Sequence, residues 1–98
     1  MTTRDDILKI LERNRETLKR YGVRRLGLFG SGARAEASET SDLDFIVEFE
    51  TDSFDVYMDL KEFLEQLFGR RVDLVLADAI KARLRPRILA EAIDVPGL

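Results

Sequence analysis

The stretch GSGARAEASETSDLD, from Gly30 to Asp44, decides how this sequence of 98 residues folds. It joins a small-residue turn to a pair of aspartates through a connection with almost no apolar residues. The segments before and after it both alternate apolar and polar residues, a pattern typical of strands. The stretch therefore predicts a polar loop between two strands, with chemistry-bearing residues gathered at both of its ends.

Three segments predict strands with one apolar face each, at residues 23–30, 42–50 and 70–76. Side chains two positions apart on a strand project from the same face. In the middle strand we expect a core face made of Leu43, Phe45, Val47 and Phe49. We expect the opposite face, which meets solvent, to carry Asp42, Asp44, Ile46, Glu48 and Glu50.

Apolar residues at helical spacing predict helices over about residues 3–20 and 53–68. The segment 78–93 predicts two helical pieces divided near Pro86, which can serve as the first residue of the second piece. The elements predict one α+β (α/β) domain over residues 1–98, with a small mixed sheet, helices mainly on one face and a site on the other. In the middle helix we expect the core to include Phe54, Phe63 and Phe68.

The composition excludes several kinds of site. The sequence has no cysteine and no histidine, which removes thiolate-bound metals, the usual zinc ligands and Ser-His-Asp relays. Catalysis is left to carboxylates, hydroxyls, lysine, arginine or tyrosine. The net charge of −3 argues against direct binding of nucleic acid. Because no apolar run approaches the roughly 20 residues of a membrane span, we expect a cytoplasmic protein without membrane contact.

The acidic residues on the predicted strands point to a cation site. Asp42 and Asp44 share one strand face, and Asp73 has the same parity in the third strand. If the two strands are neighbours, three carboxylates converge, and two unit charges ~4 Å apart repel by about 4 kcal/mol at an effective dielectric of 20. A divalent cation removes that repulsion, and ligation by oxygen alone favours Mg²⁺, with Mn²⁺ also possible.

The other end of the loop suits a phosphate group. Gly30 allows close approach of the backbone, and Ser31 offers an N–H and a hydroxyl at the start of a short helix expected over residues 33–37. Arg34 could reach phosphate oxygens from the same turn. The ending Gly-Lys-Ser/Thr of a Walker P-loop is absent.

Each of these features also has a structural explanation. Ser31 could serve only as a helix cap, and Asp42 and Asp44 could be edge charges that discourage aggregation. Asp73 could form a salt bridge with Arg70 or Arg71. A further basic cluster, made of Arg83, Arg85 and Arg87, could dock an acidic partner or form a solvated helix face.

The combined pattern resembles a known family. Gly30-Ser31, ten intervening residues and Asp42-Leu43-Asp44 are similar to the signature of the polymerase-beta-like nucleotidyltransferases. The flanking residues look like the minimal nucleotidyltransferases, single-domain prokaryotic proteins usually paired with a helical HEPN protein as antitoxin and toxin. The resemblance continues through RVDLV and LRPRILAEAI. Two positions depart from the group's usual pattern, Gly32 and Ala35.

The resemblance implies a function and a role for each residue. Asp42 and Asp44 would bind two Mg²⁺ ions, Asp73 would be the third carboxylate, and Gly30 and Ser31 would hold the triphosphate of ATP. The acceptor would be a tyrosine hydroxyl on a HEPN-family toxin, which AMP transfer neutralises. Two alternatives stay open: an antitoxin that neutralises its toxin by binding alone, and transfer to a small molecule such as an aminoglycoside.

Overall fold

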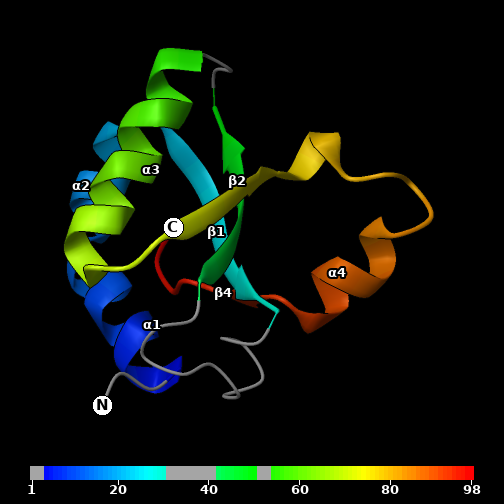
Figure 1. The fold of residues 1–98 in the computed structure, drawn as a ribbon, viewed down its shortest axis with the longest axis horizontal. Helices are drawn as coiled ribbons and strands as arrows, with labels where there is room; N and C mark the ends of the chain where they lie inside the picture. Colours follow the sequence, from blue (N-terminus) through cyan, green and yellow to red (C-terminus); the bar gives the residue numbers. More distant parts are fainter. Residues whose placement is uncertain (1–3, 31–41, 51–53) are drawn as a thin grey trace.

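A four-stranded sheet separates two unequal layers in the computed structural model, which describes residues 4–30, 42–50 and 54–98 (Figure 1). The strand order is β3-β2-β1-β4. β2 runs parallel to β3 and antiparallel to β1, and β4 is antiparallel to β1, so the predicted mixed sheet is confirmed. The strands are β1 (Val23–Phe29), β2 (Leu43–Phe49), β3 (Val72–Leu76) and β4 (Ile93–Asp94). The sequence pattern did not predict β4.

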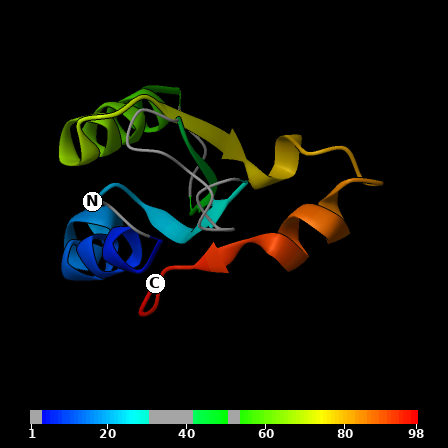
Figure 2. The ribbon, with the colours of Figure 1, turned by 60° about the horizontal axis from the view of Figure 1, so that its bottom comes forward.

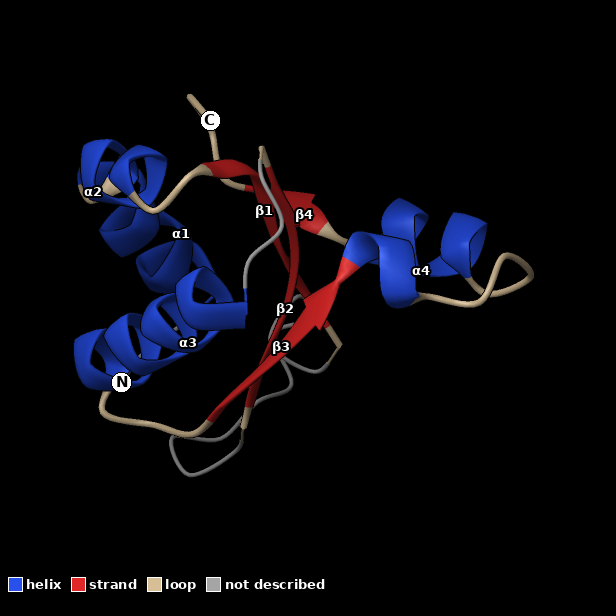
Figure 3. Ribbon diagram, turned by 90° about the horizontal axis from the view of Figure 1, so that it is seen from above, coloured by secondary structure: helices blue, strands red, loops and turns tan. Residues whose placement is uncertain are grey.

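Three helices cover one face of the sheet, α1 (Arg4–Arg13), α2 (Arg15–Arg20) and α3 (Phe54–Phe68) (Figure 3). The predicted core face of β2 is confirmed, since Leu43, Phe45, Val47 and Phe49 are all buried there. Phe54 was wrongly predicted to be buried, because its side chain is 76% exposed. It precedes the buried Leu60 by six residues, which places it about 120° around the helix from the apolar stripe.

The N-terminal segment forms two helices and not the single helix predicted over residues 3–20. The break falls at Asn14, whose side-chain Nδ2 donates to the Ile10 carbonyl at 2.7 Å. A side chain that bonds to the preceding turn competes with the regular helical ladder. Leu11 and Leu18, on either side of the break, are both fully buried, so the redirected chain keeps its apolar face on the sheet.

The second face of the sheet is partly covered by a segment that we call the C-terminal arm, residues 77–92. It consists of the 3₁₀ turn η1 (Ala77–Ala79), a loop and α4 (Arg85–Glu91), and it projects away from the sheet (Figure 2). The prediction that Ile46 meets solvent was therefore wrong, since it is 2% exposed. Around it lies a second apolar cluster made of Ala77, Ile80, Phe29, Val75, Ile88, Leu89 and Ala92. Pro86 is the second residue of α4 and not the predicted first, because the helix begins at Arg85; its missing N–H is still tolerated in the first turn.

Candidate active site

Asp44 and Asp73 lie side by side on the sheet. They are direct partners in the parallel register between β2 and β3. Their sequence neighbours point into the main core, so both carboxylates project from the opposite face, where the arm lies. Asp42 comes two residues before Asp44, at the point where β2 begins. The structure thus places the three predicted acids at one end of two neighbouring strands.

Asp44 is the electrostatic centre of this group. Burial raises the pKa of its carboxyl above the ordinary value, and the negative charges of Asp73 and Asp42 raise it further. Asp42 and Asp73 are exposed. Neither makes a hydrogen bond or an ion pair with any residue in the described ranges, so the alternative of a salt bridge from Asp73 to Arg70 or Arg71 is not found there.

The acidic group fits a hard divalent cation in its chemistry, although its side chains are spread. Within the described residues, no three acidic side chains are gathered closely enough to hold a metal ion. The exposed Asp42 and Asp73 can turn toward Asp44 without breaking a hydrogen bond or an ion pair among those residues. A cation between them would offset the repulsion that raises the Asp44 pKa. Because the donors are all carboxylate oxygens, Mg²⁺ or Mn²⁺ fits the group best.

Gly30 lies directly against Asp44. It follows β1 and has a φ of +72°, in the left-handed region that favours glycine. A Cβ atom built on Gly30 would come within 2.5 Å of the Asp44 Oδ2 atom. The turn and the carboxylate therefore share a space that only a glycine leaves free. The other predicted phosphate-binding residues, Ser31 and Arg34, and the predicted helix over residues 33–37 lie outside the described residues.

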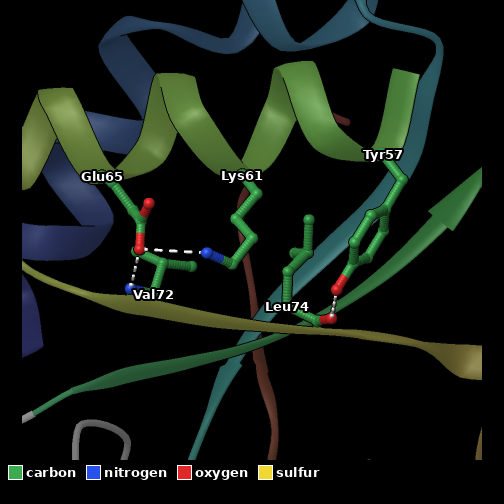
Figure 4. Close-up of polar contacts among 5 residues, drawn as sticks. All are labelled: Tyr57, Lys61, Glu65, Val72 and Leu74. Atoms are coloured by element: carbon green, nitrogen blue, oxygen red, sulfur yellow. Dashed lines mark hydrogen bonds and ion pairs between the residues drawn. The ribbon is translucent and has the colours of Figure 1, made fainter. Parts of the chain in front are cut away.

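Side chains of α3 hold the free edge of β3 on both sides of Asp73 (Figure 4). The Tyr57 hydroxyl donates to the Leu74 carbonyl at 2.5 Å. The Glu65 carboxylate accepts a hydrogen bond from the Val72 N–H at 3.0 Å and pairs with the Lys61 ammonium at 3.2 Å. The Val72 N–H and then Lys61 lower the pKa of Glu65.

The sequence pattern did not single out this contact between α3 and β3. Tyr57, Lys61 and Glu65 are not among the site residues that the sequence predicted. The available signal was their spacing: the three residues follow one another at intervals of four, which places them along one side of a helix. Three polar or half-polar side chains on a helix beside an edge strand are well placed to bind its unpaired backbone groups.

The fold and this site together define a class of enzyme, one that transfers nucleotides. The protein-family model of the nucleotidyltransferase domain matches residues 7–95 of the sequence, so the chain belongs to the nucleotidyltransferase domain family. Within the described residues, no helix has both the length and the apolar character needed to span a membrane.

Three similar proteins show where the chain lies among the nucleotidyltransferases. Protein adenylyltransferase MntA of Thermococcus cleftensis is 41% identical over 97 residues, which cover 97% of this chain and 98% of the relative. A solved chain assigned to the minimal nucleotidyltransferases is 43% identical with a TM-score of 0.74, covering 88% of this chain and 93% of its own. The predicted resemblance to minimal nucleotidyltransferases is confirmed.

The third similar protein shares the fold at low identity. It is a chain of the solved complex of a tri-AMPylated HEPN toxin of Shewanella oneidensis with an MNT antitoxin. It matches with a TM-score of 0.64 and 19% identity, over 93% of this chain and 73% of that one.

Proposed function

We propose that this protein transfers AMP from ATP to a tyrosine hydroxyl of a HEPN-family toxin and thereby neutralises the toxin. The observation that carries the proposal is the pairing of Asp44 with Asp73 across neighbouring strands, next to the glycine turn at Gly30. The close relative named protein adenylyltransferase supports a protein acceptor. The AMPylated HEPN toxin bound to a protein of the same fold supports the identity of that acceptor.

The three acids share one role in the proposed reaction, and Asp73 has a second. Asp42, Asp44 and Asp73 would hold two Mg²⁺ ions, or Mn²⁺ in their place, and such ions would neutralise phosphate charge and polarise the α-phosphate. Asp73, the exposed acid on the outer strand, accepts the proton of the tyrosine hydroxyl. The tyrosine oxygen then bonds to the α-phosphorus as the bond to pyrophosphate breaks.

The glycine turn serves the other substrate. Gly30 lets the triphosphate approach the backbone next to Asp44, since it has no side chain to block that space. Ser31 and Arg34 are proposed to bind the triphosphate oxygens. We further propose that residues 1–98 act as one domain and that the acceptor hydroxyl comes from a separate protein.

The proposal is tested by incubating the protein with its HEPN partner, Mg²⁺ and ATP labelled at the α-phosphate. We expect label on a partner tyrosine, located by mass spectrometry. Label should fall to background in the variants Asp44→Asn and Asp73→Asn. The matched control is Asp59→Asn, which removes an exposed acid from α3 on the other side of the sheet and should keep full labelling.

Two outcomes would contradict the proposal. One is a folded wild-type protein that leaves the partner unlabelled. The other is a double variant, Asp42→Asn with Asp44→Asn, that still neutralises the toxin fully in cells, which would assign neutralisation to binding alone.

A further inference from the structure

The C-terminal arm contains a run of positive charge uninterrupted by acids. It carries four cations, Lys81, Arg83, Arg85 and Arg87, and no acidic residue lies between positions 79 and 90. With Asp78 and Glu91 at its ends, the arm has a net charge of +2, whereas the rest of the chain has a net charge of −5. The segment that projects from the sheet is therefore basic on an otherwise acidic molecule (Figure 2).

The tip of the arm exposes these cations around an apolar side chain. Lys81 and Arg83 are exposed and form no ion pair with the residues that the structure describes. The Arg87 side chain is 82% exposed and forms an ion pair with Glu91 at 3.7 Å, which at that exposure contributes little. Between them lies Leu84, which is 43% exposed. An exposed apolar residue within a rim of charge is a common feature of protein interfaces.

The arm presents this surface on an ordered support. Its inner side chains pack on Ile46 in the second apolar cluster. Its loop closes on itself, because the backbone N–H groups of Leu84 and Arg85 bond to the Lys81 carbonyl at 2.9 and 3.1 Å. The Arg85 guanidinium adds a bond from Nη2 to the Ile80 carbonyl at 3.1 Å. A surface held in this way loses little conformational freedom when a partner binds.

The arm lies on the same sheet face as the acidic site. Ile46 and Val75, which pack beneath it, each lie two residues along their strands from Asp44 and Asp73. Two residues of a strand span only about 7 Å. The base of the arm therefore lies close to the acids, and a macromolecule bound to the arm approaches the sheet face that carries them.

We propose that the C-terminal arm is the docking surface for the acceptor protein, which it binds through an acidic patch surrounding an apolar pocket that receives Leu84. This inference rests on the proposed function and adds the surface and the chemistry of the partner. A nucleic acid fits less well, because its phosphates would face Asp42, Asp44 and Asp73 on the same side of the sheet. The partner's acidic patch complements the arm and holds the acceptor protein on the face that carries the site.

The test is a titration of the full chain against the purified HEPN toxin without ATP, followed by labelling with ATP and Mg²⁺. The variant reverses two arm charges, Arg83→Glu with Arg87→Glu. The matched control, Lys9→Glu with Arg13→Glu, reverses two exposed cations at the same spacing on α1, which packs on the opposite sheet face. We expect the arm variant to bind about tenfold more weakly or worse and to lose much of the salt dependence, whereas the control stays within about twofold.

An apolar pair of variants refines the test. Leu84→Ser and Met58→Ser remove side chains of equal exposure, 43%, from the arm and from α3. Only the first should weaken binding. In labelling, the arm variants should raise KM for the toxin and leave kcat unchanged, because they touch neither ATP nor the acids.

Each other outcome has a defined meaning. Equal binding by the arm variant and its control overturns the assignment of the docking surface. If the wild type binds the toxin but does not label it, the proposed function fails while the binding comparison still decides the role of the arm. No binding of the toxin by the wild type overturns both. An arm-dependent association with RNA, or between two copies of this chain, overturns the proposed partner.

Discussion

The close approach of Gly30 to Asp44 predicts that Gly30→Ala separates activity from stability. Alanine at a φ of +72° strains the backbone in the left-handed region by about 1–2 kcal/mol. For a domain of this size, each kcal/mol lowers Tm by roughly 4–8 °C. The variant should therefore stay folded with a Tm lower by roughly 4–16 °C.

The added methyl group acts on the site in a second way. It would lie 2.5 Å from the Asp44 Oδ2 atom, well inside contact distance, so the carboxylate must move. Misplacing a catalytic group by about 1 Å can cost about 100-fold in rate. We expect nucleotidyl transfer, measured as labelling at a temperature where the variant is fully folded, to fall by about that factor.

Two other glycines provide matched controls. Gly22 and Gly69 also have positive φ values, +80° and +62°, but a Cβ at either position meets no atom within 4 Å. Their alanine variants should lose similar stability and keep their activity. The reasoning is refuted if Gly30→Ala keeps wild-type activity, or if the controls lose as much activity as it does.

Four further predictions concern the acids and their supports. In metal-free protein, Asp44→Asn should raise Tm by a few degrees, because it removes a charge that burial and the neighbouring Asp73 and Asp42 both disfavour. An unchanged or lower Tm would argue against that cost. Adding Mg²⁺ and ATP at 100 times Kd should stabilise the wild type by about 2.7 kcal/mol in thermal unfolding and leave the Tm of Asp44→Asn unchanged. An equal rise of Tm in both proteins would show that Asp44 is not part of the binding site. Tyr57→Phe should lower the free energy of unfolding in denaturant by about 1 kcal/mol, because it leaves the Leu74 carbonyl without its donor. An unchanged free energy would show that water replaces the hydroxyl. The folded protein lowers the pKa of Glu65 from 4.5, so the stabilising contribution of this carboxylate is complete above pH 4.5 and is lost as the pH falls through the lower folded pKa. Glu65→Gln should therefore reduce the fall of the unfolding free energy at acidic pH. An unchanged fall would assign it to other groups.

The alternating pattern of β2 predicted the main features of the site because alternation is a local property of a strand. Once Leu43 and Phe45 are placed in the core, Asp44 must project from the other face. The same reasoning applied to β3 placed Asp73 correctly. The register that makes Asp44 and Asp73 direct partners is a tertiary feature, which the sequence could suggest only on the condition that the strands are neighbours.

The same alternation failed for Ile46, for a reason that lies far away in the sequence. Alternation assigns a residue to a face but does not say what covers that face. The arm, more than thirty residues later, packs on Ile46 through Ile80 and Ala77. An apolar residue among acids on a face expected to meet solvent was itself a signal that something packs there. Ile88 and Leu89 of α4 are among the residues that pack around it.

The three acids differ in how the fold supports them. Asp44 lies on β2, which has a neighbouring strand on each side, so backbone pairing alone fixes its position. Asp73 lies on β3, whose outer edge has no strand beside it in the described sheet. There Tyr57 and Glu65 bind the backbone of the residues on either side of it. The position of the proposed proton acceptor therefore depends on side chains of α3, so a helix on the far side of the sheet supports the site.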